Sequence, residues 1–350
     1  MGIDKRWNIR IGSLEKGKRN LITDVPGVTV GHVTLGDGKI QTGVTAIKPH
    51  QGNIYKDKLM AACHVINGHG KSIGLVEVEE LGYIETPLLM TNTLSVGTVS
   101  TGLVKYMMEM NPDLGDTTGS VNPVVFECND SELNDIRGLH VKEEHVKEAL
   151  DNCSEQFEEG AVGSGRGMRC HELKGGIGSA SRNFELDGQK FTLGVLMMTN
   201  HALYKDLMIK GDPVGERIPN PLPFQKDKGS VITVIATDVP LSERQLKRIS
   251  KRTVVGLSRT GSYMVNASGE IALAFTTANH KPHEPQTAVM PIRILHDEKL
   301  DVVFRAVAEC VEEAVLSSML HAETVTGRNN NCIHSLAEIL EKDEKYQRRQ

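Results

Sequence analysis

The sequence predicts an α/β (α+β) fold arranged as a four-layer αββα sandwich, with two sheets between outer layers of helices. Two observations lead to this expectation. Six short apolar segments are bounded by glycine, asparagine or aspartate, which is typical of strands buried on both faces. Several amphipathic segments supply helices to cover such sheets, and packed layers are how proteins bury both kinds of surface.

The expected strands are short and rich in β-branched residues. From the N-terminus onward they are GVTAIKP (43–49), LMAACHVI (59–66), VNPVVFEC (121–128), FTLGVLMMTN (191–200), VITVIATD (231–238) and EIALAFTT (270–277). Their continuous apolar runs favour sheets that are covered on both faces.

Helices are expected over four segments: 97–110, 141–152, 240–257 and 301–322. The third begins with Pro240 and Ser242, which are helix start signals. In the fourth, Val303, Val307 and Cys310 recur at steps of three and four residues. The other side of that segment is polar, which predicts an amphipathic helix with an outer face of Arg305, Glu309, Glu312 and Glu313.

Composition excludes several classes of protein. The 350 residues carry a net charge of −5, with 40 basic and 45 acidic residues interspersed, so no basic stripe indicates a nucleic-acid partner. No apolar run approaches the length needed to cross a membrane, and the six cysteines are widely spaced without a C-x-x-C pair. We therefore expect a cytoplasmic enzyme with reduced thiols. Without a linker between balanced halves, we expect a single domain over 1–350.

The most informative junction is Gly229-Ser230, where a proline-rich, charged loop (211–229) meets a strongly apolar run. If the peptide bond between them breaks, Ser230 becomes an N-terminus that carries a hydroxyl and a free amine. An α-amine titrates at about 7.7–8.0, so it can take the proton from a hydroxyl that is otherwise a weak nucleophile. Gly229 has no Cβ, which lets its carbonyl turn toward that hydroxyl for an N-to-O acyl shift. The alternative is an ordinary loop that ends in glycine before a strand.

Three further polar residues lie at strand ends. Ser268 and Glu270 are two residues apart, so alternation places both side chains on the same side of the sheet. A carboxylate beside a hydroxyl can orient a proton relay and attract a substrate ammonium group. Asn200 ends its strand, where its amide can donate to a developing oxyanion. The alternatives are a turn with an exposed acid and a turn cap.

Two other patterns are not interpreted as sites. The segment GSGRGMRCHELKGGIG (163–178) has the glycine spacing of a dinucleotide fingerprint, but it lacks the preceding strand and the following helix. Neither the pair His64 with His69 nor the pair His280 with His283 places two ligands together on a helix with a third, acidic ligand evident. We therefore expect no metal and no cofactor.

Ordered blocks across nearly the whole chain carry a resemblance to a known family. They are NLITDVPGVTVGHVT, LMAACHVINGHGKSIGL, TPLLMTNTLSVGTV, LNDIRGLHV, GSGRGMRCHELKGGIGSASR, GSVITVIATDVPLSERQLKRISKR and LSRTGSYMVNASGEIALAFTT. Together they resemble the P1 family of N-terminal-nucleophile peptidases, which includes the L-aminopeptidase/D-esterase and the bacterial β-peptidyl aminopeptidases. The resemblance implies an αββα sandwich that acts as an aminopeptidase on short peptides, amides or esters and needs no metal.

The resemblance also implies that a precursor cuts itself between Gly229 and Ser230 into an α chain (1–229) and a β chain (230–350). Ser230 is then the nucleophile of both self-cleavage and substrate turnover, through an acyl-enzyme. Such αβ units gather into a homo-oligomer, a tetramer of αβ units.

By the same resemblance, Asn200 helps to hold the oxyanion, while Ser268 and Glu270 support the nucleophile and receive the substrate amine. One position departs from the family pattern, because Glu132 stands where relatives carry a tyrosine. An ionised carboxylate cannot donate a hydrogen bond to an oxyanion. Our hypothesis is that Glu132 pairs with the incoming ammonium group instead.

Two other functions stay open on the sequence alone. The same scaffold and nucleophile suit a hydrolase of linear amide oligomers that are not peptides. The chain can also be an unprocessed, non-catalytic binding protein, since a fold does not imply an activity.

Overall fold

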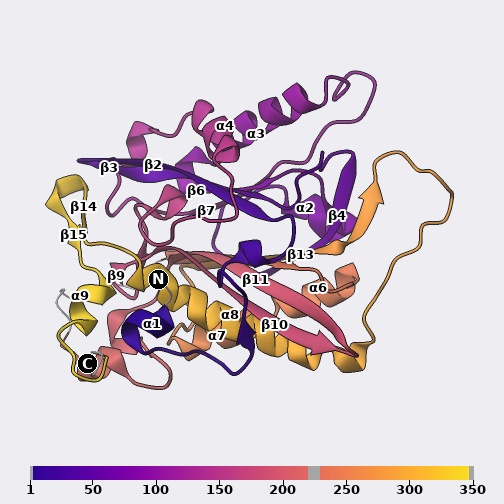
Figure 1. The fold of residues 1–350 in the computed structure, drawn as a ribbon. Helices are drawn as coiled ribbons and strands as arrows, with labels where there is room; N and C mark the ends of the chain where they lie inside the picture. Colours follow the sequence, from indigo (N-terminus) through magenta and orange to yellow (C-terminus); the bar gives the residue numbers. More distant parts are fainter. Residues whose placement is uncertain (1–2, 220–228, 347–350) are drawn as a thin grey trace.

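The computed structural model describes residues 3–219 and 229–346 (Figure 1). Its largest sheet has the strand order β1-β10-β11-β12-β13-β4-β5. In that order the strands are β1 (Glu15–Lys16), β10 (Gly176–Leu186), β11 (Gln189–Asn200), β12 (Gly229–Thr237), β13 (Ser268–Pro282), β4 (Asp57–Gly68) and β5 (Tyr83–Ile84). Neighbours pair antiparallel except β12 and β13, which are parallel.

A second sheet has four strands in the order β2-β3-β6-β7. These strands are β2 (Thr29–Asp37), β3 (Ile40–Lys48), β6 (Leu88–Asn92) and β7 (Val124–Cys128). The two sheets lie face to face in Figure 1, and apolar side chains from both fill the space between them, among them Val44, Leu89, Phe126, Leu196 and Val234. This space is one of the two main cores.

Helices cover the outer face of each sheet (Figure 1). The four-stranded sheet packs against α3 (Val96–Met110) and α4 (Glu144–Asp151), and the large sheet packs against α6 (Glu243–Ser250) and α8 (Asp301–Leu320), while α7 (Thr253–Arg259) packs against α8. The second main core lies between the large sheet and α8. The predicted αββα sandwich is therefore confirmed.

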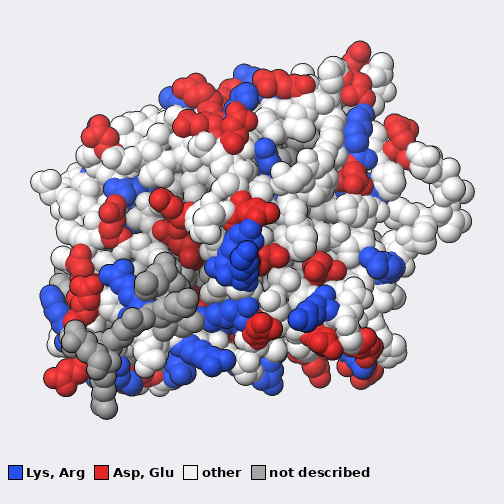
Figure 2. Space-filling model, viewed as in Figure 1, with Lys and Arg blue, Asp and Glu red and all other residues white. Residues whose placement is uncertain are grey.

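Shorter α-helices and strands are also present in the described part of the chain. They are α1 (Ile3–Trp7), α2 (Leu75–Leu81), α5 (Val214–Arg217), α9 (Leu336–Leu340), β8 (Arg169–Cys170), β9 (Leu173–Lys174), β14 (Val325–Thr326) and β15 (Cys332–Ile333). Of the loop predicted over 211–229, the stretch 220–228 lies outside the described residues. A search of the described helices finds none with the length and apolar character to span a membrane. Figure 2 shows acidic and basic side chains interspersed over one face.

The predicted outer face of α8 is wrong in part. Arg305 is exposed, but Glu309, Glu312 and Glu313 are all buried. Glu309 and Glu313 accept hydrogen bonds from the fully buried guanidinium of Arg182 on β10, at 3.1 and 2.6 Å. The N-terminal segment covers the same side of α8, because the backbone N–H of Ser13 donates to Glu309. The periodicity of a sequence identifies the polar face of a helix. It does not show whether that face is exposed to water or buried under another segment of the same chain.

Candidate active site

Ser230 is the second residue of β12, in the middle of the large sheet. On one side Ser230 pairs with Asn200, the last residue of β11. On the other side Gly229 pairs with Ser268 and Ser230 pairs with Gly269 in parallel register. Strand register therefore brings together one end of each of the strands β11, β12 and β13. The predicted site residues Asn200, Ser230 and Ser268 lie at these strand ends.

Gly229 occupies a position that admits no side chain. A Cβ built on Gly229 would lie 1.9 Å from the carbonyl oxygen of Asn200 and 2.8 Å from the Cα of His201. The Ser230 hydroxyl donates a hydrogen bond of 2.6 Å to the carbonyl oxygen of Gly229. The hydroxyl thus lies against the peptide group that joins these two residues.

Ser268 and Glu270 lie on the same side of β13, as alternation predicts. The Ser268 hydroxyl donates a hydrogen bond to the Glu270 carboxylate, and both side chains are buried. The side-chain amide of Asn67 donates to the backbone carbonyls of Val265 and Ser268, which fixes the turn before the strand. The alternative of a turn with an exposed acid is therefore wrong.

Asn200 ties three segments together through its side chain. Its Oδ1 accepts a hydrogen bond of 2.8 Å from the backbone N–H of Arg169, and its Nδ2 donates to the carbonyl oxygen of Asn129 at 3.0 Å. A side-chain amide has two N–H donors, so one remains for another acceptor. This anchoring holds the amide rigidly beside Ser230.

A cavity of about 750 Å³ opens beside Ser230. Seven segments of the chain contribute to its wall, which consists of His69, Lys71, Thr93, Glu127, Asn129, Ser131, Glu132, Arg169, Asn200, Gly229, Ser230 and Ala267. Ser268 and Glu270 are not among the described residues that line it. The nucleophile candidate and Asn200 therefore face the cavity, whereas the Ser268–Glu270 pair lies within the protein next to them.

Glu127 is a cavity residue that the sequence reading missed. It lies on β7, is buried, and accepts hydrogen bonds from the backbone N–H of Lys71, at 2.7 Å, and from the Thr93 hydroxyl. The sequence does contain a signal for it, since Glu127 is the one acid inside the apolar run VVFEC. A buried acid within a strand usually has a specific partner or a function.

Glu132 lines the cavity as well, but its charge is already matched. Its carboxylate lies 3.1 Å from Nε of Arg169, and the two side chains are 29% and 8% exposed. A buried guanidinium beside Glu132 reduces the attraction that this carboxylate has for an ammonium group. Of the two cavity carboxylates, Glu127 is therefore better placed to bind a substrate cation.

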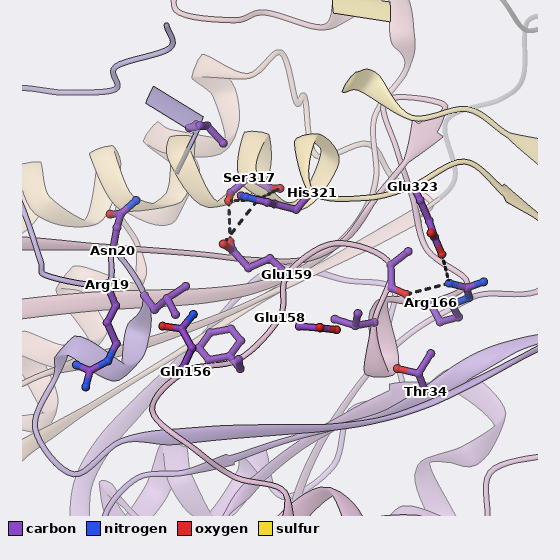
Figure 3. Close-up of a pocket in the computed structure, with 15 residues that line it drawn as sticks. Arg19, Asn20, Thr34, Gln156, Glu158, Glu159, Arg166, Ser317, His321 and Glu323 are labelled. Carbon is purple, nitrogen blue, oxygen red and sulfur yellow. Dashed lines mark hydrogen bonds and ion pairs between the residues drawn. The ribbon is translucent and has the colours of Figure 1, made fainter. Parts of the chain in front are cut away.

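A second pocket, of about 620 Å³, contains serine, histidine and glutamate side chains (Figure 3). The Ser317 hydroxyl donates to Glu159 at 2.7 Å and lies 3.0 Å from Nδ1 of His321. Glu159 lies 3.7 Å from the same Nδ1. In a catalytic triad the imidazole joins the serine and the acid through its two different nitrogens. Because both partners meet one nitrogen here, this cluster is not a proton relay.

An αββα sandwich with a serine at the start of a central strand, beside a cavity that holds a buried carboxylate, suits a serine hydrolase whose substrates carry a free amine. Comparison with known proteins agrees. Residues 20–333 match the profile of peptidase family S58. The β-peptidyl aminopeptidase BapA of Sphingosinicella microcystinivorans is 38% identical over an alignment that covers 95% of this chain and 89% of that protein.

Solved structures give the same result. The PH0078 protein of Pyrococcus horikoshii superposes with a TM-score of 0.93 at 52% identity, covering 97% of this chain and 98% of that one. The L-aminopeptidase D-Ala-esterase/amidase of Ochrobactrum anthropi, a serine aminopeptidase with a variant of the Ntn hydrolase fold, superposes at 0.89 with 34% identity and the same coverage. The chain belongs to peptidase family S58 and is an aminopeptidase.

Proposed function

We propose that this aminopeptidase activates itself by cutting its own backbone between Gly229 and Ser230, and then releases N-terminal residues from short peptides, amides or esters through an acyl-enzyme on Ser230. The observation that carries the proposal is the Ser230 hydroxyl, which lies 2.6 Å from the carbonyl oxygen of Gly229 at the wall of the cavity. The two resulting chains, 1–229 and 230–350, remain parts of one domain.

Self-cleavage proceeds by an N-to-O acyl shift. The Ser230 oxygen attacks the carbonyl carbon of Gly229, the C–N bond breaks, and the hydroxyl proton ends on the departing nitrogen of Ser230. Water then hydrolyses the ester, which leaves a carboxylate on Gly229 and restores the Ser230 hydroxyl beside a free α-amine. Glycine at position 229 supports this step, because a side chain there would clash with the backbone of Asn200 and His201 and move the carbonyl away from the Ser230 hydroxyl.

Substrate turnover uses the amine that cleavage exposes. The α-amine of Ser230 takes the hydroxyl proton as the oxygen attacks the substrate carbonyl, and that proton passes to the leaving amine or alcohol. The remaining N–H of Asn200 donates to the oxyanion. The Ser268–Glu270 pair lies across from Gly229 in the sheet and stabilises the new N-terminus. Water then releases the acyl group and restores Ser230.

The substrate is held by its own ammonium group. The buried carboxylate of Glu127 is fixed by two donors and lines the same cavity as Ser230, so it favours a free amino terminus over a blocked one. Only a chain end can reach a recessed nucleophile, which favours short substrates. Glu132 contributes less, because Arg169 already balances its charge.

The αβ units assemble into a homo-oligomer, which we propose to be a tetramer of αβ units. The segment 283–296, between β13 and α8, extends from the body of the protein in Figure 1. It exposes four large apolar side chains to solvent: Val289, Met290, Ile292 and Ile294. Such a surface is typical of a contact with another chain.

Intact-mass measurement with N-terminal sequencing tests the proposal directly. We expect two chains, the second beginning with Ser230, in place of one species of 38.3 kDa. A single species with full aminopeptidase activity would contradict self-activation. A single species without activity would favour the unprocessed binding protein, and a substrate panel separates peptides from linear amide oligomers.

A further inference from the structure

Three potential metal ligands meet next to the active site without taking part in it. Cys170 ends β8, His171 follows it, and His201 follows the last residue of β11. Their donor atoms all lie within 4.8 Å of one another, and all three side chains are buried. The Cys170 Sγ lies 3.8 Å from Nδ1 of His201. This cluster is distinct from the histidine pairs that the sequence brought to notice.

The hydrogen bonds of the two imidazoles are incomplete. Nδ1 of His171 donates to the carbonyl oxygen of Leu203 at 3.0 Å, which leaves Nε2 of His171 as an acceptor with a lone pair. That Nε2 is buried and has no hydrogen-bond partner among the described residues, whereas the nitrogen of His201 that faces Cys170 is Nδ1. Buried polar atoms without partners are rare in folded proteins and often indicate an ion.

The arrangement of His171 is the one that metal-binding histidines usually have. A ligating imidazole commonly donates its other N–H to a backbone carbonyl, which fixes the ring and its tautomer. Burial also lowers the pKa of His171 to about 4 and that of His201 to about 3, so both rings are neutral at pH 7. Neutral imidazole is the form that binds a metal.

The spacing fits zinc. With Zn–S of about 2.3 Å and Zn–N of about 2.0–2.1 Å, a sulfur-to-nitrogen distance of 3.8 Å corresponds to an angle of roughly 120° at the ion. The donor atoms of all three residues lie within 4.8 Å of one another, so the third donor is near the same centre. One thiolate and two imidazoles form a donor set that selects zinc over magnesium or calcium.

We propose that Cys170, His171 and His201 form a zinc site. On binding, the Cys170 thiol releases its proton to solvent, and the ion forms bonds to Sγ and to one nitrogen of each imidazole, with water as the fourth ligand. No electron transfer is involved.

The site has a structural role, because it clamps two segments that build the cavity. The backbone N–H of His171 already donates to the carbonyl oxygen of His201 at 2.7 Å. The preceding residues, Arg169 and Asn200, line the cavity and are joined by a hydrogen bond of 2.8 Å. An ion held by Cys170, His171 and His201 therefore stabilises the position of Asn200 without touching the substrate.

Cobalt titration of the complete, tag-free wild-type chain provides the first test. After reduction and removal of metal, we expect one Co²⁺ to bind per chain with a thiolate-to-cobalt charge-transfer absorption in the near ultraviolet, which Zn²⁺ then abolishes by displacement. A folded, reduced wild-type chain that gives no such absorption and retains no Zn²⁺ through desalting would overturn the proposal.

Two matched cysteine variants provide the second test. Cys170→Ala should lose the charge-transfer absorption and bind Zn²⁺ at least about tenfold more weakly, since a charged ligand is removed. Cys332→Ala, which removes a half-buried thiol on β15, should behave as wild type. Circular dichroism verifies that each variant is folded. If the two variants bind metal equally, the proposal is wrong; if Cys170→Ala fails to fold, the wild-type titration decides.

Discussion

Under the proposed self-cleavage, Ser230 acts in two environments, first inside an intact strand and then at a chain end. Before cleavage its hydroxyl donates to the carbonyl oxygen of Gly229, and after cleavage its own amine takes that proton. Removing the hydroxyl therefore removes both reactions at once.

We expect Ser230→Ala to give a single folded chain of 38.3 kDa without aminopeptidase activity. The substitution deletes the attacking oxygen and barely changes the side-chain volume, so the sheet should stay intact. Intact mass and circular dichroism check this outcome, with Ser131→Ala, another cavity residue, as the processed and active control. Cleavage of Ser230→Ala at the same bond would mean that another protease makes the cut.

The two cavity carboxylates should differ in their effect on substrate binding. Glu127→Gln should raise KM for free-amine substrates by about 10–100-fold, since a charged hydrogen bond contributes about 1.5–3 kcal/mol. Glu132→Gln should raise KM less, because Arg169 already neutralises that carboxylate. Steady-state kinetics on one amide substrate measures both. A larger effect of Glu132→Gln would instead show that Glu132 binds the substrate ammonium group, as the sequence analysis proposed.

At the scale of elements, the Arg182 network explains why α8 is buried on nearly every side. Arg182 on β10 balances Glu309 and Glu313 on α8, and Lys16 lies 2.6 Å from Glu313. Burying one ion without its partner is unfavourable, so the pairing of β10 with α8 depends on the whole set.

Arg182→Met should therefore lower the free energy of unfolding by about 3–5 kcal/mol, because it leaves buried carboxylates without their main partner. The triple variant Arg182→Met, Glu309→Gln, Glu313→Gln should recover part of that loss, since no buried charge is left uncompensated. Chemical denaturation measures both. Equal stability of the single and triple variants would show that Lys16 and solvent satisfy the carboxylates.

The sequence predicted most of the longer elements but not all of their surroundings. The apolar segments 191–200, 231–238 and 270–277 became β11, β12 and β13, because long runs without polar residues suit a covered sheet. The strands β2, β6 and β10 were missed; glycine, serine and charged residues interrupt the apolar pattern of β2 and β10. The segment 240–257 forms two helices, α6 and α7, rather than one.

The candidate site was predictable in part, for a physical reason. Ser230, Asn200 and Ser268 were each identified because they lie at strand ends, where polar residues stand out. Their proximity depends on strand register, which joins segments far apart in the sequence and leaves no local pattern. The Glu132–Arg169 pair was missed for the same reason.

At the scale of the whole molecule, Asp130 should make stability depend on pH. Burial raises the pKa of Asp130 to about 7, compared with an ordinary value of 3.8. Between these values the folded protein holds a proton that the unfolded chain has released, so stability falls as pH rises from about 4 to about 7. A shift of this size corresponds to at most about 4 kcal/mol.

Asp130→Asn should therefore become more stable than wild type above pH 7, while the difference should shrink toward pH 4. Unfolding free energies measured across this range check the prediction. Asp135→Asn is the control, because the pKa of Asp135 is lowered by Lys39 and no such gain is expected. Parallel curves for wild type and Asp130→Asn would contradict it.

The proposed oligomer should depend on the extended segment 283–296. Val289→Asp combined with Ile294→Asp should convert the assembly to smaller species, because each substitution places a charge where an apolar contact is proposed. Light scattering after size-exclusion chromatography measures the mass. Val76→Asp is the control: Val76 is 87% exposed on α2 and Val289 is 80% exposed, but Val76 lies outside the segment. An unchanged mass of the double variant would place the interface elsewhere.

The order β11-β12-β13-β4 in the large sheet determines whether the two chains of the cleaved enzyme can separate. Under the proposed cut, the N-terminal piece supplies strands at both flanks, and the C-terminal piece supplies the two strands wedged between them. Neither piece can dissociate without breaking the backbone hydrogen bonds between β11 and β12 and between β13 and β4. The two chains of one αβ unit therefore come from the same precursor polypeptide, and we expect no exchange of chains between different units after cleavage.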